Sequence, residues 1–464
     1  MRSLLASLRR ILSPGAAAVL TLALLSSVVV WRMQPQPRSG MLFWVFAPTH
    51  YENYLRTVPE WNRNHPGSEF HMAQLSGPAL EQRLVSGFFS GTPLADVFEV
   101  ERVMASKAFT GPLEDVGFLD VTDRLLEEGL FDQINTPSFS PWTSRGRIFG
   151  IPHDVHPVML AYRADLVEAA GIDVSQIETW EDFFRLLGPL QEDLNGDGRP
   201  DRWLLNAWDT NVEVMQILLY QAGGTYFDAH DRPILNDSRN AAILARLVTW
   251  FAGPKRMSVD LGISSALVNR QILDGVAIAS FLADWTAGSW REEIPGLAGK
   301  VKLMPLPAWE PGGRRTSVWG GTMIAVDRRS PRKEEAWEFA KNLYLSPENA
   351  ETLFRKTMII TPVKSLWSLP VFDEPDAYFS GQRVGRMLIA LAPEVPPRPS
   401  SPYASMAQQS MGNVLMQLRA YADQHAVYTV DGLIPEAQRL LEIAQGRLAR
   451  EIGRNSFLSV EESP

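Results

Sequence analysis

The fold of this chain is decided by the stretch Gly150-Ile151-Pro152-His153-Asp154-Val155-His156-Pro157-Val158-Met159-Leu160-Ala161-Tyr162-Arg163-Ala164-Asp165-Leu166. The pattern predicts a turn, a buried apolar strand and the start of a helix, with polar side chains where the strand begins. Open α/β sheets bind ligands in a crevice beside the ends of their strands. The stretch therefore predicts an α/β fold with a binding site near these polar residues.

The sequence before this stretch alternates between strand and helix patterns. Residues 41–46 form a nearly all-apolar run, which is typical of a parallel strand covered on both faces. We expect the following elements to be a helix at about 51–64, a strand near 70–75, a helix at about 77–87 and a strand at 95–100. This β-α-β-α-β order predicts a doubly wound sheet.

Several later helices carry their own start signals. Ser330-Pro331 and Ser346-Pro347 each place a serine N-cap before a proline at the first helical position. Thr179 and Asp182 have the spacing of a capping box. The last expected helix, at about 435–452, has one apolar face and should pack against a lobe of the protein.

The amino-terminal segment is typical of a chain sent to a membrane. Residues 11–31 are 21 positions without a charge, preceded by Arg2, Arg9 and Arg10. As a helix they would span roughly 32 Å, which is close to the hydrocarbon thickness of a bilayer. The arginines place the amino terminus in the cytoplasm and the rest outside, in the periplasm or on the outer face of the cytoplasmic membrane.

A cleaved signal peptide and a retained anchor begin alike. No convincing small-x-small cleavage site follows the apolar run, so we favour an uncleaved anchor. Residues 34–40 are polar and contain two prolines, as expected of a short tether. Residues 1–40 are thus interpreted as an anchor and tether.

Composition excludes several classes of function. The chain has 464 residues and no cysteine, which rules out disulfides, thiolate metal sites, cysteine nucleophiles and a lipid-modified cysteine. The first 40 residues hold five arginines and no acidic residue, so the remainder carries 39 basic and 53 acidic residues, a net charge of −14. This balance is unfavourable for binding nucleic acid or anionic membrane surfaces.

Ordered blocks of sequence carry a family resemblance. The blocks are Ser86-Gly87 through Asp96-Val97-Phe98, Gly150-Ile151-Pro152 through Tyr162, Thr179-Trp180-Glu181-Asp182-Phe183, Ala222-Gly223-Gly224, Gly275 through Trp285, Pro305-Leu306-Pro307 and Gly320-Gly321. In this order the chain resembles the family 1 extracellular solute-binding proteins, the carbohydrate receptors of ATP-binding-cassette (ABC) importers that include maltose-binding protein. It departs from them in lacking a lipobox cysteine and in having Arg163-Ala164 where Asn-Lys often follows the tyrosine.

The resemblance implies a type II periplasmic-binding-protein fold. Two α/β lobes, each completed by chain that crosses back from the other, would close over a sugar and deliver it to an ABC permease. We expect residues 41–153 plus about 313–362 to form lobe 1 and residues 154–312 plus about 363–453 to form lobe 2, followed by a tail at 454–464. The hinge is expected near residues 154–158, 309–320 and 362–369.

A sugar receptor needs flat aromatic platforms together with planar polar side chains. Four tryptophans are placed at expected strand ends or loops beside turn or polar residues: Trp44, Trp208, Trp285 and Trp319. Trp285 also falls in a block where, by the resemblance, relatives place a sugar-stacking aromatic residue. Each of the four could instead serve as buried structure.

Polar candidates cluster at the strand mouths. Glu99 and Arg102 could together hold vicinal hydroxyls, or could form a surface ion pair at a helix start. Asp154, His156 and Asp209 are further candidates, and by the resemblance His156 falls where relatives carry a polar ligand contact. His153 and His156 are not expected to form a metal pair, because an i, i+3 spacing on an extended strand points to opposite faces.

The segment Asp193-Leu194-Asn195-Gly196-Asp197-Gly198-Arg199-Pro200-Asp201 follows a calcium-loop pattern. Asp193, Asn195, Asp197 and Asp201 stand at positions 1, 3, 5 and 9, with glycine at position 6. Leu204 replaces the usual glutamate at position 12. The alternatives are a structural calcium site and a solvated turn, and no other cofactor is required.

The sequence favours binding over catalysis. It contains no Gly-x-Ser-x-Gly elbow, His-Glu-x-x-His motif, phosphate loop or dinucleotide fingerprint. We therefore expect a receptor and not an enzyme. Two alternatives stay open: a glycoside-acting enzyme, which needs only two facing carboxylates, and a membrane-anchored sensory or adaptor protein with the same fold.

Overall fold

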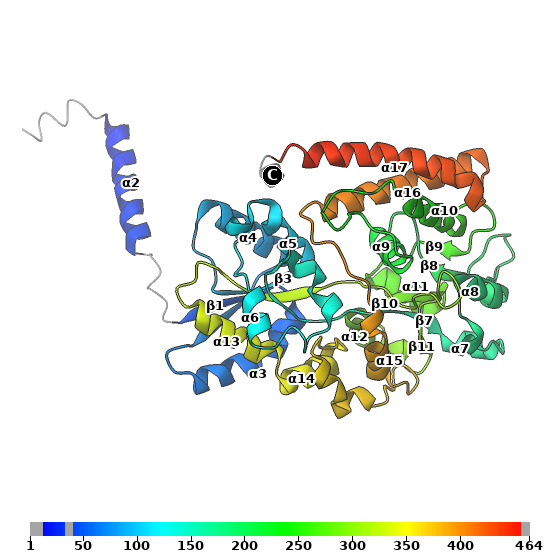
Figure 1. Ribbon diagram of the computed structural model, residues 1–464, viewed down its shortest axis with the longest axis horizontal. Coiled ribbons are helices and arrows are strands. Elements are labelled where there is room, and N and C mark those ends of the chain that lie inside the picture. The colour runs from blue at the N-terminus through cyan, green and yellow to red at the C-terminus, as the bar shows by residue number, and fades with distance from the viewer. Residues whose placement is uncertain (1–12, 33–39, 456–464) are drawn as a thin grey trace, which may run out of the picture.

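The body of the protein consists of two lobes that lie side by side, each built on a five-stranded sheet (Figure 1). The computed structural model describes residues 13–32 and 40–455. In lobe 1 the strand order is β2-β1-β3-β12-β6, and in lobe 2 it is β11-β7-β10-β8-β9. The expected two-lobed α/β fold is confirmed.

The sheet of lobe 1 begins as the sequence predicts. The strands are β1 (Met41–Val45), β2 (Phe70–Gln74), β3 (Val97–Glu101), β6 (Ile151–Pro152) and β12 (Thr322–Val326). β1 pairs in parallel with both β2 and β3, which confirms the β-α-β-α-β start. β12 returns from lobe 2 and runs antiparallel to β3 and β6, so the finished sheet is mixed.

The apolar run of β1 is continuous because helices cover both faces of the sheet. Phe43 and Val45 pack in one core, which also takes in residues of α3 (Pro48–Asn64) and α13 (Lys333–Tyr344). Trp44 points to the opposite face, into a core that includes residues of α4 (Gly77–Ser90). A strand that is buried on both sides cannot show which of its side chains faces a ligand.

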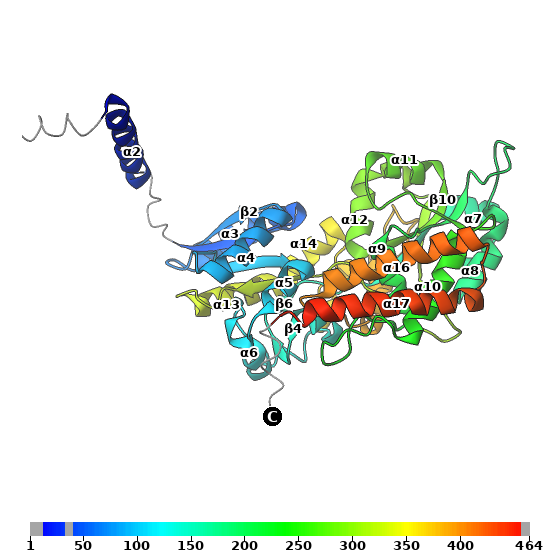
Figure 2. The same ribbon diagram turned by 90° about the horizontal axis from the view of Figure 1, so that it is seen from above.

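Lobe 2 is organised around β10 (Ala277–Ala283), all of whose residues are buried. Its neighbours are β7 (Val158–Arg163), β8 (Trp203–Asn206), β9 (Ser258–Val259) and β11 (Val301–Pro305). The helices that pack around this sheet include α8 (Trp180–Leu187), α9 (Val212–Gln221), α10 (Ser238–Phe251), α16 (Ala404–His425) and α17 (Val430–Ile452). α16 and α17 lie side by side along one edge of the lobe (Figure 2).

Shorter elements complete the two lobes. They are α5 (Arg102–Lys107), α6 (Thr122–Glu127), α7 (Ala164–Ala169), α11 (Ala266–Asp274), α12 (Asp284–Glu293), α14 (Pro347–Thr357), α15 (Val384–Leu391), β4 (Thr143–Ser144) and β5 (Arg147–Ile148). α12 of lobe 2 and α14 beside lobe 1 contact each other.

Two of the three predicted helix starts are confirmed. The Ser346 hydroxyl accepts a hydrogen bond from the Asn349 N–H, and Thr179 with Asp182 forms a complete capping box. The start predicted at Ser330 is wrong, because α13 begins at Lys333. The Ser330 hydroxyl instead donates to Asp96 at 2.7 Å, which uses the side chain to tie this turn to β3.

Three stretches of chain pass between the lobes. Pro152 belongs to the sheet of lobe 1 and Val158 to the sheet of lobe 2. Trp319 lies in the core of lobe 2, whereas β12 returns to lobe 1 at Thr322. Residues 358–372 contribute to both cores. A ligand site is expected in the space between the lobes where these three stretches meet.

The N-terminal helix α2 (Pro14–Arg32) stands apart from both lobes (Figures 1 and 2). None of the helices within residues 13–32 and 40–455 combines the length and apolar character needed to cross a bilayer. The predicted span starts at residue 11, and residues 11 and 12 lie outside the described residues, as do residues 33–39 of the tether and 456–464 of the tail.

Candidate functional site

A cavity of about 350 Å³ lies between the lobes at the carboxyl ends of three strands. Phe46 follows β1, Glu101 ends β3 and Trp285 follows β10, and all three line the cavity. Ligand pockets typically measure about 300–1,000 Å³ and combine an apolar lining with a few polar groups. The cavity therefore has the position and size of a site for a small ligand.

Trp285 is fixed in place by its surroundings. Its indole Nε1–H donates to the Trp319 carbonyl at 3.1 Å, and the two rings meet edge to face with centroids 5.4 Å apart. The side chain stands at the start of α12, where Ser289 and Glu292 follow one and two turns later and line the same cavity. One face of α12 therefore forms the wall of the cavity on the lobe 2 side.

Glycine is required at two places where the backbone closes around the cavity. Gly320 has φ of +99°, and a Cβ there would lie 2.9 Å from the His156 ring and 3.0 Å from Trp285 Nε1. A Cβ on Gly288 of α12 would lie 2.2 Å from the Thr357 carbonyl oxygen. Any larger residue at Gly288 would push α12 away from α14.

His156 is clamped between two carboxylates. Its Nε2 lies 3.0 Å from Asp154 Oδ2 and its Nδ1 lies 2.5 Å from Asp284 Oδ1. Burial works against a charged imidazole, but the negative charges of Asp154 and Asp284 outweigh burial and raise the pKa of His156 to about 10. His156 is therefore an imidazolium at neutral pH and lines the cavity as a positive group.

Asp154 holds two imidazoles and does not line the cavity. Its Oδ2 also lies 3.1 Å from His153 Nδ1. Burial opposes the carboxylate form, but His156 and His153 together hold the pKa of Asp154 below its usual value. The expectation that His153 and His156 point to opposite faces of a strand is wrong, because both lie between β6 and β7 and His156 has a left-handed φ of 55°.

Glu99 and Arg102 do not form the expected pair. Glu99 is fully buried in lobe 1, and its carboxylate is held by His50 at 2.8 Å, the Tyr54 hydroxyl at 2.7 Å and the Tyr344 hydroxyl at 2.9 Å. Because these three side chains surround it, Glu99 does not line the cavity, and its contact with a ligand stays a prediction. The Arg102 guanidinium lies 3.5 Å from both Glu101 and Glu213, outside the cavity.

Two of the predicted tryptophans are structural. Trp44 is buried in the core of lobe 1, where its ring centroid lies 6.0 Å from that of Phe98, so the prediction that it faces the cleft is wrong. Trp319 is also buried, and its backbone carbonyl accepts the hydrogen bond from the Trp285 indole. The ring of Trp319 lies behind Trp285 and outside the cavity.

Trp208 and Asp209 are also not brought to the cavity. The Trp208 ring is contacted by the guanidinium groups of Arg256 and Arg419, which lie 5.6 Å and 5.0 Å from its centroid. Asp209 is buried and forms an ion pair with Arg419 at 2.6 Å. This group ties the end of β8 to α16 within lobe 2.

The 193–201 loop uses its acidic side chains to hold its own backbone. Asp193 accepts hydrogen bonds from the N–H groups of Gly196 and Gly198, each at 2.7 Å. Asp201 accepts from Asn195, and Asn195 accepts from Asp197. These bonds keep the four predicted oxygen donors on one loop, away from the cavity, and the calcium site stays a prediction.

A second, wider cavity of about 1,210 Å³ lies among residues 122–148, 225–231 and 397–400. Its walls are loops and short turns, together with α6 and the β4–β5 hairpin. They include none of the strand ends that meet at the smaller cavity. The smaller cavity is the better candidate, because both sheets direct their strand ends to it.

The model of one family matches residues 48–351 of the chain: Bacterial extracellular solute-binding protein. The chain belongs to this family. Among curated proteins, this solute-binding protein is 23% identical over 410 residues to an arabinooligosaccharide-binding protein from Halalkalibacterium halodurans, covering 87% of this chain and 88% of the relative. An arabinooligosaccharide-binding protein from Bacillus subtilis is 24% identical over 393 residues, covering 82% and 88%.

Solved structures show the same fold. The sugar-binding protein MalE from Xanthomonas citri matches this solute-binding protein with a TM-score of 0.71 at 15% sequence identity. The match covers 89% of this chain and 99% of MalE. The type II periplasmic-binding-protein fold is therefore confirmed.

Sequence reasoning missed part of the cavity of this solute-binding protein. Glu101, Ser289 and Glu292 line the cavity but were not predicted. Trp285, Ser289 and Glu292 have i, i+4 and i+7 spacing, which places them on one face of a helix. A helix predicted to start at Asp284 would have revealed Ser289 and Glu292. No comparable signal pointed to the contact between Asp284 and His156, which are 128 positions apart.

Proposed function

We propose that this solute-binding protein captures a carbohydrate in the cavity between its lobes and passes it to an ABC permease. The observation that carries the proposal is the composition of the cavity wall, where the Trp285 ring stands with Glu101, Glu292 and His156. A sugar presents apolar C–H faces and a ring of hydroxyls, which suit an aromatic ring and charged hydrogen-bonding groups. The two curated relatives, named for arabino-oligosaccharide binding, support the same ligand class.

Ligand binding is expected to favour closure of the two lobes. The cavity takes Phe46 and Glu101 from lobe 1 and Trp285 and Glu292 from lobe 2. A ligand that contacts both walls binds the closed arrangement more strongly than the open one, and therefore shifts the population towards closure. The closed form would then dock on the permease.

The uncharged run at residues 11–31 supports a location outside the cytoplasm. We propose that the N-terminal segment is an uncleaved membrane anchor, because no small-x-small cleavage site follows the run. We also keep structural calcium at Asp193, Asn195, Asp197 and Asp201 as a separate proposal. A receptor of this kind releases its ligand unchanged, so we expect no turnover of the sugar.

The proposal predicts that one class of saccharide stabilises the full chain. Thermal unfolding would be followed with arabino-oligosaccharides, galactobiose and maltose, each with calcium or a chelator in parallel. A ligand at a hundred times its dissociation constant adds about 2.7 kcal/mol to the free energy of unfolding, which raises the midpoint by a few degrees.

The control is recovery of the saccharide after the scan. Hydrolysed sugar would indicate a glycoside-acting enzyme. A folded sample whose midpoint is unchanged by every saccharide would contradict carbohydrate binding and leave the sensory or adaptor alternative.

A further inference from the structure

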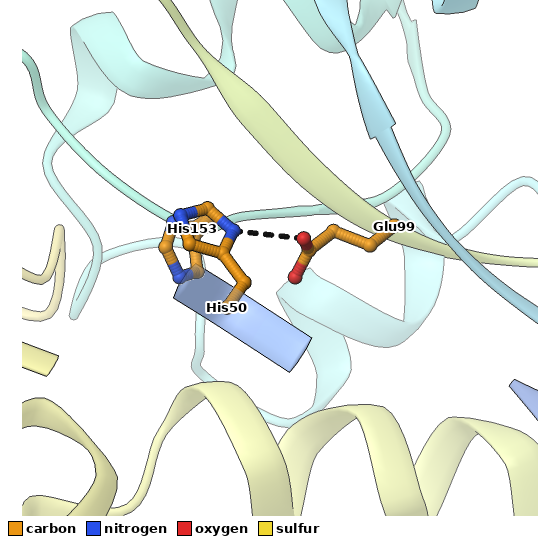
Figure 3. Close-up of side chains that lie close together, drawn as sticks. All are labelled: His50, Glu99 and His153. Carbon is orange, nitrogen blue, oxygen red and sulfur yellow. Dashed lines mark hydrogen bonds and ion pairs between the residues drawn. The ribbon is translucent and has the colours of Figure 1, made fainter. Parts of the chain in front are cut away.

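Three side chains from separate elements meet inside lobe 1, next to the cavity (Figure 3). His50 comes from the first turn of α3, Glu99 from the middle of β3 and His153 from the residue after β6. One nitrogen or oxygen from each lies within 4.8 Å of the others, and all three side chains are buried. In the part of the chain that the structure describes, this is the one such group of histidine and acidic side chains.

His153 presents a nitrogen that has no hydrogen-bond partner. Its Nδ1 lies 3.1 Å from Asp154, and a carboxylate can only accept, so Nδ1 carries the proton and Nε2 carries a lone pair. Nε2 is buried and unpaired. An unpaired buried acceptor is costly unless a ligand completes it.

The Glu99 carboxylate is held so that one of its oxygens faces a histidine of this group. Its Oε2 accepts hydrogen bonds from the Tyr54 and Tyr344 hydroxyls, while its Oε1 faces His50 Nδ1 at 2.8 Å. One carboxylate oxygen of Glu99 is therefore fixed by two tyrosine hydroxyls, and the other faces His50.

We propose that His50, Glu99 and His153 form a binding site for one divalent transition-metal ion, with zinc as the best match. Two imidazoles and one carboxylate are the protein ligands of many zinc sites that keep a fourth position open. The ion would replace the proton shared by His50 and Glu99. Ligand atoms about 2.1 Å from zinc lie about 3.4 Å apart in a tetrahedral site. The three donor atoms lie within 4.8 Å of one another, so metal binding would draw them closer together.

Neighbouring side chains hold the proposed ligands in place, as they do in many metal-binding proteins. Asp154 accepts from the far nitrogen of His153, and two tyrosines hold Glu99, which are the outer contacts that orient metal ligands.

An ion can reach the proposed site from the interlobe cavity. His50 is buried in lobe 1 but lines the interlobe cavity, so the proposed site lies at the wall of that cavity. Imidazole and carboxylate donors select zinc over calcium and magnesium, which prefer all-oxygen sites. The zinc site and the predicted calcium loop are therefore separable by metal preference.

The test is metal binding by the full chain without any saccharide, so its outcome is independent of carbohydrate binding. Protein freed of metal with a chelator would be titrated with Zn²⁺ in competition with a chromophoric chelator, and separately with Co²⁺. We expect one ion per chain and the intense visible absorption of four-coordinate cobalt. His153→Gln and Glu99→Gln should each weaken zinc binding at least tenfold, and Asp154→Asn should weaken it about 10–100-fold.

His230→Gln is the matched control, since His230 is an exposed histidine of lobe 2 and should leave zinc binding unchanged. Circular dichroism would establish that each variant is folded. If a variant fails to fold, X-ray absorption spectroscopy of the zinc-loaded wild type tests the proposed ligands instead. We expect it to show two imidazole ligands on the zinc. Failure of the wild type to bind zinc overturns the proposal, as does equal affinity in His153→Gln and Glu99→Gln or an absorption spectrum without imidazole.

Discussion

Replacing Asp284 with alanine is expected to lower the free energy of unfolding by about 3–5 kcal/mol. Asp284 is fully buried, and its carboxylate lies 2.5 Å from His156 Nδ1. It also accepts hydrogen bonds from the N–H groups of Trp285 at 2.8 Å and Ile360 at 3.2 Å. The variant would leave a buried imidazolium with one carboxylate fewer and two N–H groups without their acceptor. Urea unfolding of the full chain at pH 7 would measure the loss.

Asp274→Ala is the matched control. Asp274 is exposed and pairs with Arg270 one helical turn away, so its loss should cost about 0.5 kcal/mol or less. Because the pKa of His156 is raised to about 10, its ion pairs stabilise the fold fully below the unfolded-state value of about 6.5 and fade as pH rises towards 10. The difference in the free energy of unfolding between wild type and Asp284→Ala should therefore become smaller from pH 7 to pH 10. Equal losses in both variants would contradict the buried ion pair.

Trp285→Ala is expected to weaken saccharide binding by about 1–3 kcal/mol, which corresponds to roughly 5–150-fold in the dissociation constant. The ring lines the cavity and is held by its hydrogen bond to the Trp319 carbonyl, so the free protein already has it in place. Isothermal titration of the full chain with the saccharide that raises the unfolding midpoint would measure the change.

Trp208→Ala provides the comparison, because Trp208 is another half-buried tryptophan of lobe 2 that follows a strand. Its ring contacts two arginines and lies outside the cavity, so its removal should leave the dissociation constant within about twofold of wild type. A loss in Trp208→Ala that exceeds the loss in Trp285→Ala would place the ligand elsewhere in lobe 2.

The fold was predictable because its signals are local. The apolar run at 41–46, the capping box at Thr179 and the proline after Ser346 each specify an element from a few neighbouring residues. The return of β12 into the sheet of lobe 1 is not local, since it pairs with β3 more than 200 positions earlier. Its antiparallel direction could not be inferred from residues 322–326 themselves.

The site was only partly predictable, because side-chain direction depends on distant partners. Strand-end reasoning correctly brought Trp285 and His156 to the cavity. It failed for Trp44, whose strand is buried on both faces, and for Glu99, which two tyrosines and a histidine hold inside lobe 1. The link from His156 to Asp284 joins the chain crossing between β6 and β7 to lobe 2 and has no sequence signature.

The central claim is that a carbohydrate binds between the lobes and closes them, and an interlobe distance tests it most directly. The chain has no cysteine, so two introduced cysteines can carry spin labels without background. Leu55→Cys on α3 and Leu267→Cys on α11 lie in different lobes, and the native side chains are 53% and 68% exposed. Electron spin resonance should show a shift to shorter distances when the stabilising saccharide is added, and Trp285→Ala should need roughly 5–150 times more saccharide to reach the same shift. An unchanged distance distribution in protein saturated with saccharide would contradict closure by the ligand.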